Sequence, residues 1–165
     1  MKKLSILLIA FLCLVGCGNE KIKEENNKPI NEMSDTIWIA SDGSEMIFEE
    51  KDFNWYKDEG VHNDNYYTGT YEYYRGEAAV KFITTELSQY GVTEEELNTI
   101  FASDSKRTKE NFVVFNMVYS SITINGETSA PPRSLVPWYG FILEDGTFLD
   151  VVNMNTATYY KFTKK

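Results

Sequence analysis

The sequence predicts a mainly β (α+β) fold: a single antiparallel β-barrel or strongly curved sheet with a two-helix insertion at about 77–102. Short strand-like runs divided by Gly and Asp turns predict the sheet, and one stretch of helical spacing predicts the insertion. The 165 residues are 42% hydrophobic, which is enough for one domain with a substantial core. The aromatic content of 15% excludes a disordered chain, because such chains lack Tyr, Trp and Phe.

Four strand-like segments open the domain. Turn residues at 41–44 and 50–52 separate the first three, and a polar loop at 58–65 precedes the fourth. The fourth segment alternates clearly. The residues that share one face are Tyr67, Gly69, Tyr71 and Tyr73, and those that share the other are Thr68, Thr70 and Glu72. The expected strands are 37–39, 45–49, 53–56 and 66–74.

Helical spacing then replaces alternation. Gly91 follows the first helical run and is placed as its C-cap. Thr93 and Glu96 form a capping box, which predicts a shorter second helix through Phe101. The apolar positions of the first run, at i, i+3, i+7 and i+10, are Val80, Ile83, Leu87 and Tyr90.

Strands return after a polar loop at 103–110. The stretch 144–147 carries Asp and Gly between two apolar runs and is typical of a hairpin turn. The expected strands of this half are 112–119, 121–125, 138–143, 148–152 and 158–162.

Aromatic and turn residues recur in the order Trp38, Asp42-Gly43, Phe48 and Tyr67-x-Gly69-x-Tyr71. This order resembles small lipocalin-like lipoproteins of bacteria, over roughly residues 36–75 and 137–163. The resemblance implies a small β-barrel and transfers no ligand. The Gly-x-Trp of true lipocalins is absent from the first strand, and the helical pair interrupts the run of strands.

The first 17 residues have the pattern of a targeting signal. Lysines at positions 2 and 3 precede an apolar run over 4–15, which is too short for a bilayer-spanning helix of about 20 residues and is typical of a signal peptide. The run ends in Leu14-Val15-Gly16-Cys17, which resembles the lipobox of bacterial lipoproteins. That resemblance implies a diacylglyceryl group on the Cys17 thiol and removal of residues 1–16.

Residues 17–34 then comprise the acylated cysteine and a polar tether, which as a flexible coil would reach roughly 20–25 Å. The β-rich domain over 35–165 has 11 Lys and Arg against 21 Asp and Glu, a formal net charge of −10. Such acidity excludes nucleic acid as a partner. We expect the domain at the outer face of the cell membrane, and the Lys- and Asn-rich composition is typical of a low-GC Gram-positive bacterium.

Residues suited to catalysis or metal binding are sparse. The one histidine, His62, lies in a polar loop. The sequence contains no Gly-x-Ser-x-Gly motif that would supply a serine nucleophile for a catalytic triad with it. Ser103 and Lys106 match Ser-x-x-Lys, but the companion motifs of that site are missing. We expect no catalytic residue, no metal and no cofactor. The oxygen ligands of the His62 loop, which lack EF-hand spacing, are Asp58, Glu59, Asn63 and Asp64.

Aromatic side chains are the remaining candidates for a site. Tyr and Trp combine apolar area with a polar handle, which suits both ligand pockets and protein interfaces. The interior of an eight-strand barrel is just wide enough for side chains or one small ligand, and we expect rings this large to fill it. The candidate ligand or interface residues are Trp38, Trp55, Tyr67, Tyr71, Tyr73 and Phe141.

These features predict a membrane-anchored lipoprotein that acts as a non-enzymatic binding module for an envelope or secreted protein, including inhibitory or immunity roles. The alternative is a lipocalin-like carrier of a small apolar or peptide ligand, and a hydrolase is a remote third. A carrier requires an internal cavity of several hundred Å³. A protein binder requires a filled core and an exposed apolar patch.

The lipobox generates the first prediction. Cys17→Ala removes the acylated thiol and should move the protein from the membrane fraction to the soluble or secreted fraction, since two or more acyl chains are what make such anchorage stable. Fractionation of cells that express each variant measures this. Cys13→Ala is the matched control and should stay membrane-bound; a Cys17→Ala variant that also stays there would contradict the lipoprotein assignment.

Overall fold

The computed structural model describes residues 31–165, so the signal peptide, Cys17 and most of the expected tether lie outside the described residues. Residues 31–165 form one folded unit. Within this part of the chain, no helix has both the length and the apolar character needed to cross a membrane.

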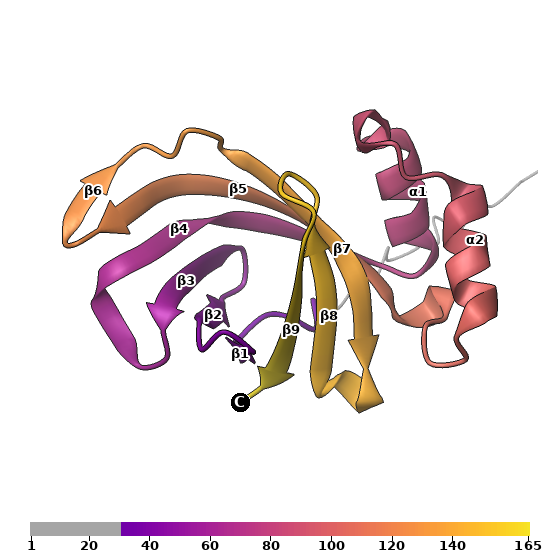
Figure 1. The fold of residues 1–165 in the computed structure, drawn as a ribbon, viewed down its shortest axis with the longest axis horizontal. Coiled ribbons are helices and arrows are strands. Elements are labelled where there is room, and N and C mark those ends of the chain that lie inside the picture. Colours follow the sequence, from indigo (N-terminus) through magenta and orange to yellow (C-terminus); the bar gives the residue numbers. More distant parts are fainter. Residues whose placement is uncertain (1–30) are drawn as a thin grey trace, which may run out of the picture. The chain divides into compact units, whose positions relative to one another are not determined.

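Eight of the strands close an antiparallel barrel (Figure 1). Around the ring the order is β4-β3-β2-β1-β9-β8-β7-β5, and a β4–β5 ladder closes it, while β6 pairs with β5. Strands of the ring follow one another in chain order, with β6 set beside β5 and the first strand, β1, paired with the last, β9, as in an up-and-down barrel. The predicted fold class is confirmed. The strands are β1 (Thr36–Ala40), β2 (Glu45–Phe48), β3 (Asp52–Asp58), β4 (Val61–Arg75), β5 (Phe112–Ile124), β6 (Glu127–Ser129), β7 (Leu135–Leu143), β8 (Phe148–Asn153) and β9 (Thr158–Lys164).

Three strand predictions differ from the structure. No strand is expected at 127–129, where the short β6 pairs with β5; its three exposed polar residues carry no apolar alternation. The expected loop over 58–65 is a tight hairpin, because Gly60 at φ 73° lets β3 turn directly into β4. The expected strands 112–119 and 121–125 are one strand, β5, with Ser120 as an extra residue opposite β4. A bulge of this kind bends a strand without ending it, which sequence periodicity does not distinguish from a break.

The helical insertion connects β4 to β5 and consists of α1 (Glu77–Thr85), the 3₁₀ turn η1 (Ser88–Tyr90) and α2 (Glu94–Ser103). The capping box is confirmed: Thr93 Oγ1 accepts from the Glu96 backbone N–H at 3.2 Å, and Glu96 Oε2 accepts from the Thr93 N–H at 2.9 Å. The first helix ends earlier than predicted. Its last residues, Thr84 and Thr85, turn their hydroxyls back onto backbone carbonyls, which weakens helix continuation.

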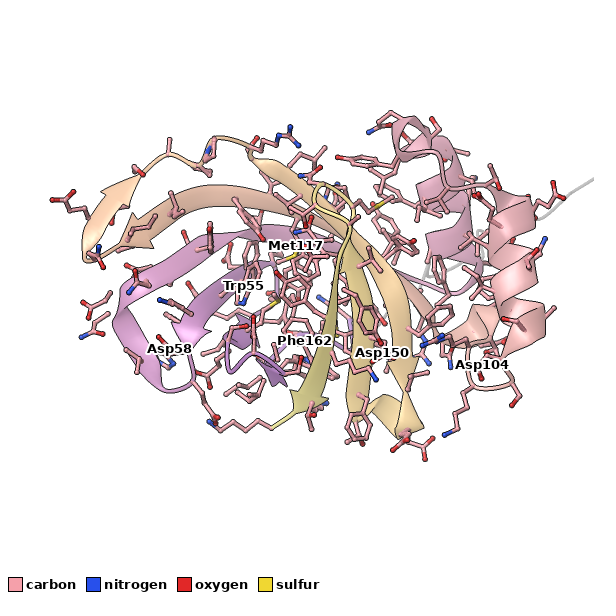
Figure 2. All side chains as sticks on the ribbon, in the orientation of Figure 1. Trp55, Asp58, Asp104, Met117, Asp150 and Phe162 are labelled. Atoms are coloured by element: carbon pink, nitrogen blue, oxygen red, sulfur yellow. The ribbon has the colours of Figure 1, made fainter. Side chains whose placement is uncertain are left out.

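Two apolar cores result. The helices pack against the outer faces of β5 and β7, where a cluster forms around Ile83, Leu97 and Phe112, all 0% exposed. The larger core fills the barrel with aromatic and methionine side chains (Figure 2). Its most buried large members are Trp38, Trp138, Phe48, Phe53, Phe115, Phe162, Met33 and Met117.

Gly69 allows β4 to approach β5 and β3 closely beside the bulge. A Cβ at this position would lie 2.2 Å from the Val118 carbonyl oxygen and 2.7 Å from the Phe53 ring. Neither group can retreat far, since one is backbone in the closing ladder and the other is 1% exposed.

Gly69→Ala should therefore destabilise the domain by about 2–3 kcal/mol, the upper part of the range for overpacking. Urea unfolding followed by tryptophan fluorescence measures the change. Thr70→Ala, one residue along the same strand and exposed, is the control and should lose less than about 0.5 kcal/mol. Equal losses in the two variants would refute the steric account.

A buried carboxylate ties the C-terminus to the β3–β4 hairpin. Glu45 is 2% exposed; its Oε2 accepts from the Gly60 N–H at 3.1 Å and lies 2.6 Å from His62 Nε2. Lys165 Nζ lies 3.4 Å from Oε1 and 2.9 Å from Glu59 Oε1. Burial acts most strongly and would raise the pKa of Glu45, but the hydrogen bonds from His62, Gly60 and Lys165 together hold this pKa below the usual value of 4.5.

Because the pKa of Glu45 is lowered in the folded protein, the free energy of unfolding should fall as the pH is lowered. A carboxyl whose folded pKa is depressed stabilises the fold above its unfolded pKa, and the contribution is lost as pH falls through the folded pKa. Glu45→Gln should cost about 2 kcal/mol at pH 7 and flatten the loss of stability below about pH 4.5. Unfolding curves between pH 3 and pH 7 test this, with exposed Glu127→Gln as the control that should leave the profile unchanged.

Candidate functional site

The two ends of the barrel differ, and one of them is closed by the chain itself. Met33, 0% exposed, plugs the end where residues 31–35 enter β1. Asn31 Nδ2 donates to the Tyr71 hydroxyl at 2.8 Å, and that hydroxyl donates to the Glu49 carbonyl at 2.7 Å. Burial raises the pKa of Tyr71 to about 12, so the phenol stays a neutral donor. Residues 31–34, assigned to the tether from sequence, contact the barrel in this way.

At the opposite end, which we call the mouth, aromatic rings from five strands meet. Trp55 on β3 is the centre: its ring centroid lies 5.7 Å from Tyr67, 5.4 Å from Trp138 and 5.7 Å from Tyr160. Tyr119 of β5 adds a fifth ring, 5.1 Å from Tyr67. Figure 2 labels Trp55 among these side chains, between the strands of the two halves of the barrel.

The mouth contains two adjoining pockets. The larger, of about 470 Å³, lies over Trp55, Tyr67, Tyr119 and Tyr160, and has a polar rim. The smaller, of about 300 Å³, shares Trp55 and Tyr67 with the first. The larger volume falls in the range of small-molecule and side-chain binding sites. Its rim comprises Pro131, Pro132, Arg133, Asn153, Asn155, Thr156 and Thr158.

The floor of the larger pocket includes the indole N–H of Trp55, a hydrogen-bond donor, and the hydroxyl of Tyr119. The Trp55 Nε1 atom is buried and has no hydrogen-bond partner among the described residues. Burial raises the pKa of Tyr119, the nearby phenols of Tyr67 and Tyr160 raise it further, and the Trp138 indole partly offsets the rise. Tyr119 is therefore neutral at physiological pH. A ligand that reaches these groups would be matched by offering an acceptor.

The turn between β8 and β9 is fixed from two sides. The Tyr90 hydroxyl, from the helical insertion, donates to Asn155 Oδ1 at 2.8 Å, and Asn155 Nδ2 donates to the Leu135 carbonyl at 2.8 Å. Asn153 Oδ1 accepts from the Asn155 and Thr156 backbone N–H groups at 3.0 and 3.3 Å. The insertion thus positions one rim of the larger pocket.

Of the six aromatic candidates, the structure brings two together at the mouth, Trp55 and Tyr67. The other four lie elsewhere and are packed. Trp38, Tyr71 and Tyr73 belong to the barrel core or pack against it, and the Trp38 Nε1–H donates to Thr36 Oγ1 at 2.9 Å. Phe141 faces outward into the cluster beneath the helices.

Sequence reasoning missed the remaining rings of the mouth and the rim. Tyr119 and Tyr160 lie in strands that were predicted, but the faces of those strands were not assigned. The sequence predicts a loop around Pro131 and Pro132 and a turn at 153–156, with no role for either, and Thr158 opens the expected strand 158–162. The only sequence signal for them was the clustering of Pro and Asn between strands, which indicates a turn and not a pocket.

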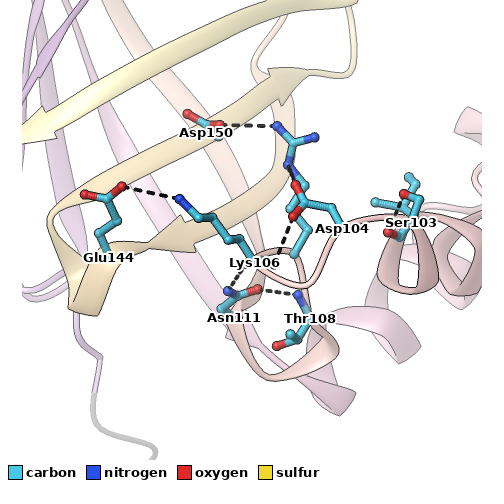
Figure 3. Close-up of polar contacts among 9 residues, drawn as sticks. Ser103, Asp104, Lys106, Thr108, Asn111, Glu144 and Asp150 are labelled. Atoms are coloured by element: carbon cyan, nitrogen blue, oxygen red, sulfur yellow. Dashed lines mark hydrogen bonds and ion pairs between the residues drawn. The ribbon is translucent and has the colours of Figure 1, made fainter.

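The polar candidates are engaged in structural contacts. His62 pairs with Glu45 and its ring stacks on Tyr56 at 4.0 Å. Ser103 Oγ donates to the Ile100 carbonyl at 2.8 Å, whereas Lys106 Nζ lies 4.0 Å from Glu144, so these two side chains have different partners (Figure 3). Among residues 31–165, no three His, Cys, Asp or Glu side chains are grouped as a metal site.

No protein-family model matches the chain, and searches of curated proteins and of solved structures found no match either.

The hydrogen bond between Tyr90 and Asn155 allows a test of whether the helical insertion stabilises the turn between β8 and β9. Tyr90→Phe removes one hydrogen bond worth about 1 kcal/mol and should speed amide exchange at Asn155 and Thr156 by about fivefold. Hydrogen exchange read by NMR or mass spectrometry measures it. Tyr66→Phe, in β4, is the control and should leave the 153–158 turn unchanged; unchanged exchange in Tyr90→Phe would show that the turn holds itself.

Proposed function

We propose that the chain is an extracytoplasmic lipoprotein, acylated at Cys17, whose barrel mouth binds an exposed segment of an envelope or secreted protein without chemical reaction. The observation that carries this proposal is the aromatic pocket of about 470 Å³ at the end of the barrel opposite the Met33 plug. An anchor upstream of residue 31 joins the domain at the plugged end. The mouth is thereby left available to a partner.

The distribution of apolar groups favours a protein partner over an enclosed small ligand. The barrel below the mouth is filled by side chains. The pocket has an aromatic floor and a polar rim, as the anchoring centres of protein interfaces have. One large apolar side chain that the described chain exposes, Ile124 at 55%, also lines the smaller pocket.

Carriage of a small apolar or peptide ligand is the second candidate, and the pocket volumes favour it. Together the two pockets have room for a compound of a few hundred daltons that lies across Trp55 and Tyr67. An acceptor that reached the unpaired Trp55 Nε1–H would relieve a burial cost of about 1–3 kcal/mol.

Site-specific photo-crosslinking on intact cells tests the proposal. A benzophenone side chain at Arg133, exposed on the rim, should yield one discrete protein adduct, and the same group at Lys81, exposed on α1, should not. Trp55→Leu, which removes the centre of the floor, should reduce the Arg133 adduct at least fivefold.

The three other outcomes have distinct meanings. An adduct of low mass at Arg133 would favour the carrier. Equal adducts at Arg133 and Lys81 would show that the mouth is not the binding surface. Persistence of the Arg133 adduct in Trp55→Leu would refute the role of the aromatic floor.

A further inference from the structure

The smaller pocket of the mouth sets a carboxylate beside aromatic rings. Asp42, in the turn between β1 and β2, lines this pocket with Trp55, Tyr66 and Tyr67. Its Oδ1 accepts from the Ser44 backbone N–H at 3.0 Å and from Ser44 Oγ at 2.7 Å, which holds the carboxylate in one orientation. Asp42 forms no ion pair with any lysine or arginine of residues 31–165.

The charge of Asp42 reaches the rings of the mouth. Burial raises the pKa of Tyr160, and the Asp42 carboxylate raises it further through space. The segments around the mouth carry more acids than bases; the bases are Lys57, Arg133 and Lys165, and the last of these pairs with Glu59. The acids of these segments are Asp42, Asp58, Glu59, Asp64 and Glu127. The mouth therefore shares the acidic character of the domain, which favours the approach of a cation.

We propose that the smaller pocket binds a cationic side chain, a guanidinium or an alkylammonium, of the same partner segment whose apolar side chain occupies the larger pocket. This inference rests on the proposed function of the mouth and names the chemistry of its partner. The cation lies over the rings of Trp55 and Tyr67 and pairs with Asp42.

The arrangement of the two pockets indicates where the two bound side chains lie in the sequence of the partner segment. Trp55, Tyr67 and Ile122 line both pockets and so form the wall between them. Two side chains that straddle this wall come from neighbouring positions of one extended segment. An apolar residue next to a basic one satisfies both pockets, whereas two apolar residues leave Asp42 without a partner.

Lys57 lines the same pocket and allows a test of whether the pocket binds a cation or an anion. Its ammonium repels a bound cation, although it forms no ion pair with Asp42. Lys57→Ala should therefore tighten cation binding, whereas Asp42→Asn should weaken it. A site that recognised an anion would show the opposite pair of changes.

Two matched probes separate charge from shape: acetyl-phenylalanyl-arginine amide and acetyl-phenylalanyl-citrulline amide, which differ in charge and hardly in size. The full-length lipidated protein in detergent is titrated with each, and tryptophan fluorescence reports occupancy beside Trp55. The arginine probe should bind about fivefold more tightly than the citrulline probe. Asp42→Asn, which keeps the acceptor for Ser44, should reduce that ratio to about one.

Asp58→Asn is the control, because it removes the same charge from the adjoining hairpin without lining either pocket; it should keep most of the ratio. Equal binding of both probes to the unaltered protein, or a ratio unchanged by Asp42→Asn, would overturn the cation site and leave the aromatic mouth standing. Failure of both probes to bind at millimolar concentration would overturn the cation site, and with it the peptide-binding mouth on which it rests.

Discussion

The antiparallel pairing of β4 with β5 closes the barrel and sets the position of both the helices and the mouth. It joins Tyr66–Arg75 to residues 113–123 and turns a meander into a closed barrel without free edges in the ring. Because the helical insertion is the connection between these same strands, the pairing also keeps the helices beside β5 and β7. The bulge at Ser120 and the close approach at Gly69 set the bend of this ladder beside Tyr119, one of the rings of the mouth.

Closure gives the two ends of the barrel different physical roles. At one end the incoming chain supplies Met33 and Asn31, so Tyr71 becomes a core residue with a satisfied hydroxyl. At the other end nothing in the described chain covers Trp55 and Tyr67 completely, and a pocket remains over them. The same residue types thus stabilise the fold at one end and line an open pocket at the other.

Buried carboxylates add side-chain contacts to those of the barrel ladders. Glu45 secures the C-terminal Lys165 and the β3–β4 hairpin. Asp150, 8% exposed, lies 3.5 Å from Arg107 and so ties the loop after α2 to the outer face of β8 (Figure 3). Asp42 differs from both, since its charge has no basic partner in the described chain and is available to a ligand.

Most elements of this protein are predictable from its sequence, because the strand alternation, the helical pair and the Thr93–Glu96 capping box depend on local periodicity and local hydrogen bonds. The aromatic core is predictable too, and Trp38 and Tyr71 lie there. Which rings stay accessible is not predictable in this way, because that depends on closure of the barrel and on the plug at one end. Trp55 and Asp42 are 13 positions apart on different strands and turns, and only register places them at one pocket.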